Sequence, residues 1–236
     1  MTEAPDYPPG LYDLLAWHGL LRPGMRALDL GTGDGALARG LAAQGASVLG
    51  LDPDPRALDR ARILSPGGNP AFACGLAERT DQPEAAFDLV TAGRAWHWFT
   101  RDLAAAEVRR VLKPGGALVL CHYDWVAPPG SVAHATEHLL AALIPSLRLS
   151  PGSGFYPAWA EALAGAGLVD CGFGGFDVVR HWDRAAWCAH VAAVAGVGRC
   201  KREGVTATLA ALLAERFPEG KLPVTWRLFV LWARRA

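Results

Sequence analysis

The stretch Ala27-Leu-Asp-Leu-Gly-Thr-Gly-Asp-Gly35 decides the fold. It begins as a short apolar run that contains one acid, Asp29, and it ends in glycines at every second position, Gly31, Gly33 and Gly35. Glycine weakens a strand, because it adds unfolded-state entropy and has no side chain to pack. We therefore expect a buried strand over residues 25–30 that stops at the glycines, and a ligand that needs a bare backbone there.

Strand and helix patterns alternate along the rest of the chain. Gly45 is placed to end the first helix after the glycines. Strands that alternate with helices form βαβ units, whose right-handed crossovers give a parallel sheet covered on both faces. The expected fold is α/β: a doubly wound, mostly parallel, seven-stranded Rossmann-like sheet with an added helical cap. The expected strands cover 25–30, 47–51, 71–74, 87–92, 117–122, 171–179 and 224–233, and the expected helices cover 11–20, 35–44, 55–64, 101–112, 132–147, 158–165, 184–197 and 206–217.

No internal repeat or low-complexity linker divides the chain. We therefore expect a single domain over 1–236, with a cofactor half at about 1–125 and a helical elaboration that selects the substrate at about 126–223. Turn clusters at 128–130 and 150–154 bracket the helix expected over 132–147, and we expect that helix to cap the site.

Composition argues against a nucleic-acid partner. Of the 236 residues, 51% are hydrophobic and 19% are charged, as in an ordinary globular protein. Lys+Arg and Asp+Glu both number 23, so the net charge is zero. Nucleic-acid binding relies on many uncompensated cations, and we expect no nucleic-acid partner.

The cysteines and the N-terminus indicate a cytoplasmic protein. The five cysteines are widely spaced and include no C-x-x-C pair, so we expect reduced thiols and no metal site, with Cys74 and Cys121 buried inside strands. The N-terminus has neither the basic region nor the apolar region of a signal peptide, and no apolar run reaches the ~18 residues of a membrane helix. We expect no membrane contact, and the oligomeric state stays open.

A second acid accompanies the glycines. Asp52 ends the next expected strand, Leu49-Gly-Leu-Asp52, and follows Gly31 by 21 residues. In doubly wound folds the ligand lies at the carboxyl ends of the strands, where an acid at this spacing accepts the hydroxyls of a ribose. The helix that follows the glycines offers unpaired N–H groups at the same edge. A ligand that contains a nucleoside is therefore expected.

The spacing alone does not distinguish between two ligands that contain a nucleoside, NAD and S-adenosylmethionine. Gly31-x-Gly33-x-x-Ala36 also satisfies the dinucleotide fingerprint, so NAD is compatible with it. Asp29 lies two residues before the first glycine, where a carboxylate would repel a pyrophosphate and attract a cation. S-adenosylmethionine carries a sulfonium and an ammonium and no phosphate, and an acid suits it better.

Six motifs in order then point to a family. The chain resembles class I S-adenosylmethionine-dependent methyltransferases, and within them the small-molecule branch similar to ubiquinone-biosynthesis and trans-aconitate methyltransferases (methyltransferase type 11 domain). The segment from Tyr7 to Leu11 is also similar to the first segment of that family. The motifs are Leu28-Asp-Leu-Gly-Thr-Gly-Asp-Gly35, Leu49-Gly-Leu-Asp-Pro53, Gly75-Leu-Ala-Glu78, Phe87-Asp-Leu-Val90, Ala95-Trp-His-Trp-Phe99 and Arg110-Val-Leu-Lys-Pro-Gly-Gly-Ala117.

The resemblance implies S-adenosyl-L-methionine as the cofactor and an acceptor that is a small molecule. Gly31, Gly33 and the neighbourhood of Asp29 would face the methionine part of the cofactor, and Asp52 would hold the ribose hydroxyls. The full set of cofactor-binding residues that we expect is Asp29, Gly31, Thr32, Gly33, Asp52, Pro53, Leu76, Ala77 and Gly93.

On the adenine side the resemblance implies that Pro53 packs on the base and that Leu76 and Ala77 border its edge. Relatives often have an acid where Leu76 stands, so a side-chain contact to the adenine amine is missing here. Many relatives have glutamine where this chain has Arg94. A cation close to a sulfonium is unfavourable, and we expect Arg94 to turn towards solvent or towards an anionic substrate.

The catalytic candidates are His97, His122 and Tyr123, with no metal. Methyl transfer from a sulfonium depends mainly on alignment of donor and nucleophile, and a base adds to it for protonated nucleophiles. We expect the aromatic neighbours of His97, Trp96 and Trp98, to exclude water and to lower its pKa, which would keep it neutral near pH 7.

Tyr123 and Trp125 follow the fifth expected strand and predict an apolar, aromatic wall for the substrate. Two other functions use the same residues. A nicotinamide-dependent oxidoreductase would use the same glycines and Asp52, and a non-catalytic S-adenosylmethionine-binding protein would keep the cofactor residues without turnover.

Overall fold

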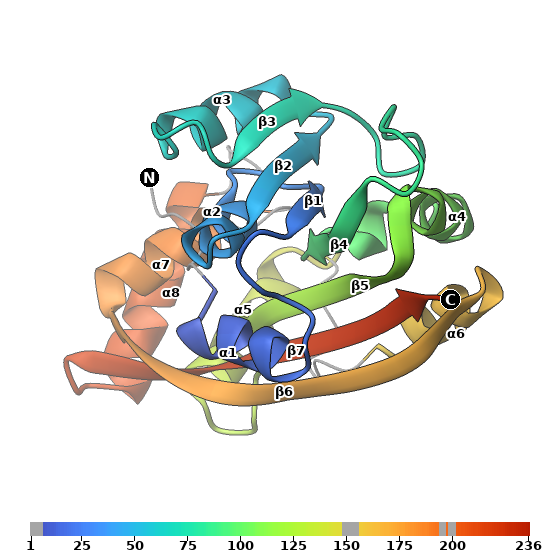
Figure 1. Ribbon diagram of the computed structural model, residues 1–236. Coiled ribbons are helices and arrows are strands. Elements are labelled where there is room, and N and C mark those ends of the chain that lie inside the picture. The colour runs from blue at the N-terminus through green and yellow to red at the C-terminus, as the bar shows by residue number, and fades with distance from the viewer. Residues whose placement is uncertain (1–6, 148–155, 194–196, 198–201) are drawn as a thin grey trace. The chain divides into compact units, whose positions relative to one another are not determined.

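A seven-stranded sheet in the order β3-β2-β1-β4-β5-β7-β6 forms the centre of the fold (Figure 1). The computed structural model describes residues 7–147, 156–193, 197 and 202–236. The pairs β1–β2, β1–β4, β2–β3 and β4–β5 are parallel, and β7 runs opposite to β5 (Figure 1). This confirms the mostly parallel α/β sheet expected from the sequence. The strands are β1 (Arg26–Leu30), β2 (Ser47–Asp52), β3 (Ala71–Cys74), β4 (Phe87–Gly93), β5 (Leu112–Trp125), β6 (Leu168–Asp183) and β7 (Lys221–Arg235).

The helices agree with most of the expected ranges. The helix expected over 132–147 ends at Leu143, and residues 194–196 of the helix expected over 184–197 lie outside the described residues. The helices are α1 (Pro9–Trp17), α2 (Ala36–Ala43), α3 (Pro55–Ile63), α4 (Arg101–Val111), α5 (Val132–Leu143), α6 (Pro157–Gly165), α7 (Arg184–Ala193) and α8 (Arg202–Arg216), with a short 3-10 helix η1 (Trp96–Trp98).

The chain divides into two compact units. Of the described residues, the sheet unit comprises 7–123, 156–175 and 229–236, and the helical unit comprises 124–147, 176–193, 197 and 202–228. Strands β5, β6 and β7 contribute residues to both units. That the whole chain is one domain, and that the helix at 132–147 caps the site, stay predictions.

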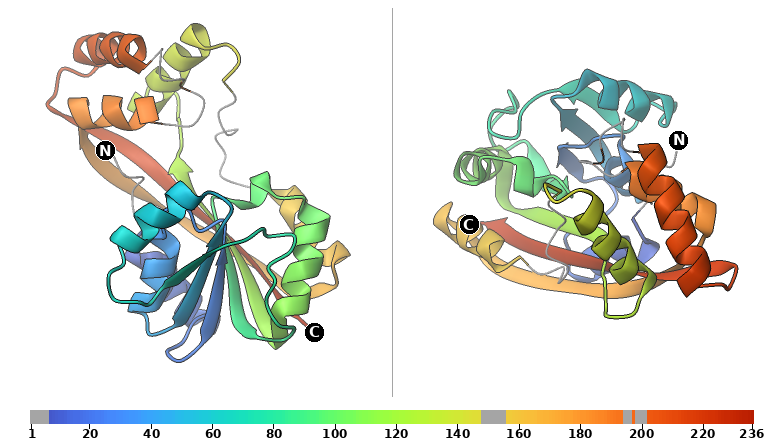
Figure 2. Two further views of the ribbon diagram at one scale, coloured as in Figure 1. Left: turned by 90° about the horizontal axis from the view of Figure 1, so that it is seen from above. Right: turned by 180° about the vertical axis from the view of Figure 1, so that it is seen from behind.

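Within the sheet unit, helices cover both faces of the sheet. Helices α2 and α3 lie on one face, and α4 and α6 lie on the other (Figure 2). The strands are apolar on both sides where they pass between these layers, as parallel strands must be. Leu28, Leu30, Val90, Leu118 and Leu120 are all completely buried and belong to one core cluster.

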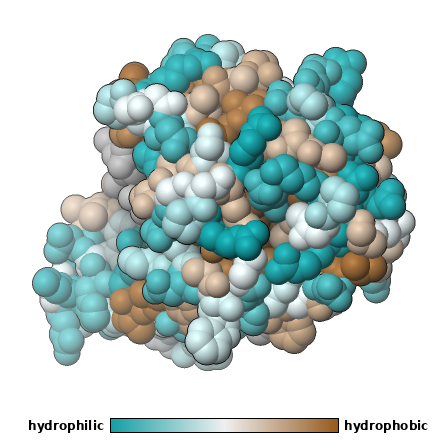
Figure 3. All heavy atoms as spheres, in the orientation of Figure 1, coloured by the Kyte–Doolittle hydropathy of each residue, from teal (hydrophilic) through white to brown (hydrophobic). Residues whose placement is uncertain are grey.

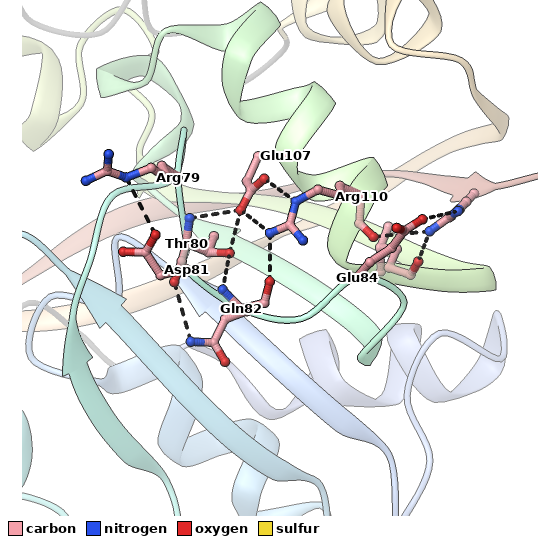
Figure 4. A network of polar contacts seen from close by, with 9 residues as sticks. Arg79, Thr80, Asp81, Gln82, Glu84, Glu107 and Arg110 are labelled. Atoms are coloured by element: carbon pink, nitrogen blue, oxygen red, sulfur yellow. Dashed lines mark hydrogen bonds and ion pairs between the residues drawn. The ribbon is translucent and has the colours of Figure 1, made fainter.

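A polar network ties the loop between β3 and β4 to helix α4 (Figure 4). The Glu107 carboxylate accepts hydrogen bonds from the backbone N–H of Thr80 (2.9 Å) and from its hydroxyl (2.6 Å). It also accepts from Arg110 Nε and Nη2, at 2.7 and 2.8 Å. The bonds from Arg110, together with those from Thr80, lower the pKa of Glu107 to about 2. The network holds the loop that leads from the β3 edge into β4.

The helical unit has its own core. Helices α5, α7 and α8 pack together, and Trp187 and Trp226 are buried there. Trp187 Nε1 donates to the Thr136 hydroxyl at 3.0 Å, and Trp125 Nε1 donates to Glu137 Oε1 at 2.8 Å. These bonds satisfy indole groups that would be costly to bury alone. In the described part of the chain, no helix combines the length and the apolar character that crossing a membrane needs.

Candidate functional site

The glycine turn between β1 and α2 has the backbone that its sequence predicts. Gly31 and Gly33 have φ of 63° and 58°, which side chains other than glycine rarely adopt. A Cβ on Gly31 would lie 2.5 Å from Cβ of Ala95, whereas a Cβ on Gly33 would meet nothing within 4 Å. The backbone at Gly33 is therefore open to a ligand, and the one at Gly31 is held by close packing.

Asp29 lies beneath this turn with its carboxylate buried. Its two oxygens accept hydrogen bonds from the hydroxyls of Thr91 (2.6 Å) and Thr32 (2.7 Å). Burial raises the pKa of Asp29 to about 6, and the two hydroxyls oppose that rise. The site thus contains an acid that is only partly compensated and would gain from a cation.

Asp52 ends β2 beside the same turn. Its carboxylate accepts hydrogen bonds from the backbone N–H of Gly33 at 2.8 Å and of Asp54 at 2.9 Å. A carboxylate offers about four lone-pair sites, so about two remain for other donors. Asp52 therefore links the glycine turn to the start of α3 and still has capacity for a ligand.

A pocket opens at the carboxyl ends of β1 and β4. It collects five of the nine expected cofactor residues: Asp29, Gly31, Thr32, Gly33 and Gly93. The other five residues that line it are outside the expected set: Tyr7, Asp34, Ala36, Leu37 and Arg94. The carboxyl edge of the sheet is where doubly wound folds bind ligands.

The other expected cofactor residues lie beside this pocket and do not line it. Asp52 pairs in register with Cys74, and the backbone N–H of Gly75 donates to the Asp52 carbonyl at 3.3 Å. The β3 end thus lies beside the β2 end. Pro53 and Leu76 are exposed there, and Ala77 is buried.

Cys74 corrects one expectation. Its thiol is exposed, whereas Cys121 is buried as expected. The reason is topological: β3 is the edge strand of the sheet, and Cys74 is its last residue.

His97 also differs from its expectation. It lies on η1 and is exposed, and its neighbour Trp98 is 74% exposed, so the aromatic run does not exclude water from it. Of the two tryptophans that flank His97, only Trp96 is buried. The expected direction of the pKa of His97 is nevertheless found, because partial desolvation and the charge of Arg101 both lower it.

His122 and Tyr123 lie on β5 and are buried. The His122 ring lies 4.8 Å from that of Tyr156 and 6.2 Å from those of Trp159 and His97, measured between centroids. Burial lowers the pKa of His122 to about 4, with smaller contributions from His97 and Arg94. His122 is neutral at pH 7 and belongs to an aromatic cluster with α6.

Three further residues of the site were not among the expected cofactor residues. Thr91 holds Asp29, Tyr7 lines the pocket from the segment before α1, and Arg94 directs its guanidinium to 5.7 Å from the Tyr7 ring centroid. Arg94 is half-buried and lines the pocket, and its two expected orientations, towards solvent and towards an anionic substrate, stay predictions. The similarity of the segment at Tyr7 to the family was the one signal that could have found Tyr7.

We also looked at other surface features for a second candidate site. A second pocket in the sheet unit, lined by Arg22, Asp88 and Lys113 among others, lies where β1 and β4 begin. Within the described ranges, no group of three or more histidine, cysteine or acidic residues could hold a metal ion. The face drawn in Figure 3 mixes hydrophilic and hydrophobic residues in small patches.

Comparison with known proteins finds a methyltransferase domain in this chain. The family model for a methyltransferase domain matches residues 28–120. An uncharacterised methyltransferase of Mycobacterium tuberculosis is 39% identical over 116 residues, which are 49% of this chain and 45% of the relative. A ubiquinone/menaquinone biosynthesis C-methyltransferase of Cupriavidus metallidurans is 34% identical over 115 residues, 46% of this chain and 47% of the relative. The chain spans about half the length of the curated relatives it matches.

The solved structures extend the fold over the whole chain. A protein described as a type II methyltransferase from Anaeromyxobacter dehalogenans has a TM-score of 0.71 at 24% identity, over 98% of each chain. Residues 28–120 therefore match a methyltransferase domain in sequence, and the solved structure shows that the whole chain has a methyltransferase-like fold. This confirms the family that the six motifs indicate.

Proposed function

We propose that the protein transfers a methyl group from S-adenosylmethionine to a small-molecule acceptor. The observation that carries this proposal is the pocket in which a buried acid, Asp29, lies beneath an open glycine backbone at Gly33. The pairing of this partly compensated carboxylate with a bare turn suits a cationic ligand better than a pyrophosphate. It therefore favours this cofactor over NAD.

The residues present fit the cofactor. At pH 7 the Asp29 carboxyl is mostly ionised, because its pKa of about 6 lies below that pH. It would attract the ammonium of the methionine part. The free lone pairs of Asp52 would accept the ribose hydroxyls, and the exposed Pro53 and Leu76 would cover the adenine. When bound, S-adenosylmethionine supplies a methyl group that its sulfonium already activates towards nucleophiles.

The task of the protein is then to align the acceptor and to accept its proton. Orientation of two reactants contributes ~7–11 kcal/mol to such reactions, and a base typically contributes about 10²–10⁴-fold. His97 is the base that we propose. Its lowered pKa keeps it neutral near pH 7, and its exposure leaves it accessible to an acceptor. The exposed Trp98, whose ring centroid lies 4.9 Å from that of His97, offers an apolar surface for an aromatic acceptor.

A product-mass screen tests this function. The purified protein is incubated with methyl-labelled S-adenosylmethionine and a panel of small-molecule acceptors that carry hydroxyl, amine, thiol or activated carbon nucleophiles. The expected result is a gain of one labelled methyl on at least one acceptor, with less product from the Asp52→Ala variant at cofactor concentrations that do not saturate it. Cofactor binding without any methylated product across the panel would instead favour a non-catalytic binding protein.

A further inference from the structure

A second pocket of the sheet unit opens at the edge of the sheet opposite to the pocket of Asp29. It lies where β4 and β5 begin and where β7, which runs opposite to β5, ends (Figure 1). Its volume is about 300 Å³, and the buried Leu20, Met25 and Ala117 form an apolar part of its lining. This volume is at the small end of the range for ligand sites.

The described residues that line this pocket include three cations and one acid. The cations are Arg22, Lys113 and Arg234, and the acid is Asp88. Lys113 Nζ donates to Asp88 Oδ1 at 2.7 Å, so these two charges compensate each other. An excess of two positive charges therefore remains on Arg22 and Arg234. In a chain whose net charge is zero, this local excess attracts an anion.

Arg234 is held in the pocket by neutral groups. Its Nη1 donates to the Gly115 carbonyl and its Nη2 to the His18 carbonyl, both at 3.2 Å. The two carbonyls position the guanidinium without neutralising its charge. Because a guanidinium has five N–H donors, donors remain for a ligand.

Arg22 supplies the second uncompensated charge. Its side chain is exposed and forms no ion pair within the described part of the chain. Burial acts to raise the pKa of Asp88, but the hydrogen bonds from Lys113 and from the backbone N–H of Arg26, with the charges of Lys113 and Arg22, lower it. Asp88 is thus ionised at pH 7 and already bonded through both of its oxygens.

The backbone of the pocket is bare at two glycines. Among the described residues, a Cβ on Gly19 or on Gly115 would meet nothing within 4 Å. Both glycines line the pocket together with the three cations. A ligand can therefore approach the backbone closely in the same pocket that carries the excess positive charge.

We propose that this pocket binds a phosphate dianion, as inorganic phosphate or as a small phosphomonoester. A phosphate group concentrates about two negative charges on one small group, which matches the excess charge on Arg22 and Arg234. Guanidinium groups also fit the geometry of phosphate oxygens. The proposal goes beyond the proposed function and does not depend on it, because the two pockets lie at opposite edges of the sheet.

Calorimetric titration with inorganic phosphate and with phenyl phosphate, at pH 8 in 0.1 M sodium chloride, tests the proposal. At least one of them should bind with a dissociation constant below about 1 mM, and succinate, a dicarboxylate, should bind at least tenfold more weakly. Tighter binding of phenyl phosphate would identify an ester as the ligand, and equal binding would identify phosphate itself. Failure of both to bind in chloride, or equal binding of succinate, would overturn the proposal.

Variants with opposite expected effects locate the site. Arg22→Ala should weaken phosphate binding about tenfold, and Arg22→Lys should retain part of the affinity. Asp88→Asn removes the acid and should tighten binding. Arg60→Ala, which removes an exposed arginine from the last turn of α3, is the matched control and should change nothing. Because Arg22 has no described ion pair, Arg22→Ala should keep the melting temperature of the ligand-free protein. Unchanged phosphate affinity in Arg22→Ala would overturn the site.

The cofactor serves as an independent check. Phosphate should bind equally well to the ligand-free protein and to protein saturated with S-adenosylhomocysteine, and Arg22→Ala should bind S-adenosylhomocysteine as the wild type does. Displacement of phosphate by S-adenosylhomocysteine would place phosphate in the pocket of Asp29 and overturn the proposal. A protein that binds phosphate but not the cofactor would overturn the proposed function alone, so the two failures are distinguishable.

Discussion

The carboxylate of Asp52, at the end of β2, accepts a hydrogen bond of 2.8 Å from the backbone N–H of Gly33 in the glycine turn. A second bond, from the N–H of Asp54, connects the same carboxylate to the start of α3. Asp52 therefore has a structural role in the ligand-free protein in addition to the ribose contact that we propose. Any test of Asp52 therefore has to measure both the stability of the ligand-free protein and the affinity for the cofactor.

Asp52→Ala is expected to lower the affinity for S-adenosylhomocysteine at least tenfold, because charge-assisted hydrogen bonds are worth ~1.5–3 kcal/mol each. It should also lower the melting temperature of the ligand-free protein, since the N–H groups of Gly33 and Asp54 lose their acceptor. Calorimetry and thermal unfolding measure the two effects. Asp59→Ala, an exposed acid on α3, is the control and should change neither. An unaltered dissociation constant for Asp52→Ala would show that the residue is structural only.

Asp29 predicts a pH dependence of binding. Its folded pKa is raised to about 6, so the carboxyl becomes protonated as the pH falls through that value. If the ionised form binds the ammonium of the cofactor, affinity should rise with pH, with a midpoint near 6 in titrations of the wild type. Asp29→Asn should bind more weakly and show no such midpoint. A flat profile for the wild type would separate Asp29 from cofactor binding.

The stability of the ligand-free protein should depend on pH in the opposite direction to its affinity for the cofactor. An acid with a raised pKa favours folding while it is protonated, and its contribution is lost as the pH rises through about 6. Asp29→Asn should therefore remove part of the decline in the free energy of unfolding between the ordinary pKa of aspartate and neutral pH. Urea unfolding of the ligand-free protein across that range measures it.

Glu107 predicts a free energy of unfolding that falls as the pH is lowered, opposite to the effect of Asp29. Its pKa is lowered to about 2, so its stabilisation is fully present above the ordinary pKa of glutamate and is lost as the pH falls through about 2. Glu107→Gln should lower the free energy of unfolding at neutral pH by roughly 2 kcal/mol, since bonds to a charged acceptor are lost. The difference from the wild type should shrink in acid. Glu84→Ala, an exposed acid 3.5 Å from Arg235, should have a much smaller effect.

His97→Gln tests the proposed base. Its side chain is exposed, so the variant should fold and bind the cofactor normally. Turnover should fall by roughly two to four decades if His97 accepts the proton of the acceptor. A variant that retains full turnover would show that His97 is not the base. The base would then be His122 or Tyr123, or the acceptor would need none. A loss of cofactor binding would instead assign His97 to the cofactor site.

The first four strands could be predicted from sequence almost to the residue. The expected 71–74 agrees with β3, and 47–51 differs from β2 by one residue, because glycines and short apolar runs mark these ends locally. The later strands extend beyond their expected ranges. Strand β5 begins at Leu112, where it pairs with Phe87 before a register shift, and such pairing is not encoded in the local pattern.

The same distinction applies to the site. Asp29 and the glycines could be placed together because they are close in sequence and end the first strand. Tyr7 and Arg94 meet only through the packing of the first segment against β4, which no spacing predicts. The exposure of Cys74 and His97 likewise depends on what covers an edge strand and a short helix. Aromatic or apolar neighbours in the sequence do not determine whether these two side chains are exposed.

The most direct test of the central claim is a calorimetric titration of one protein preparation with S-adenosylmethionine, its demethylated product and NAD. The pocket of Asp29, Gly31 and Gly33, with Asp52 beside it, predicts binding of the first two with micromolar affinity and no measurable binding of NAD. Binding of NAD together with no response to S-adenosylmethionine would contradict the account.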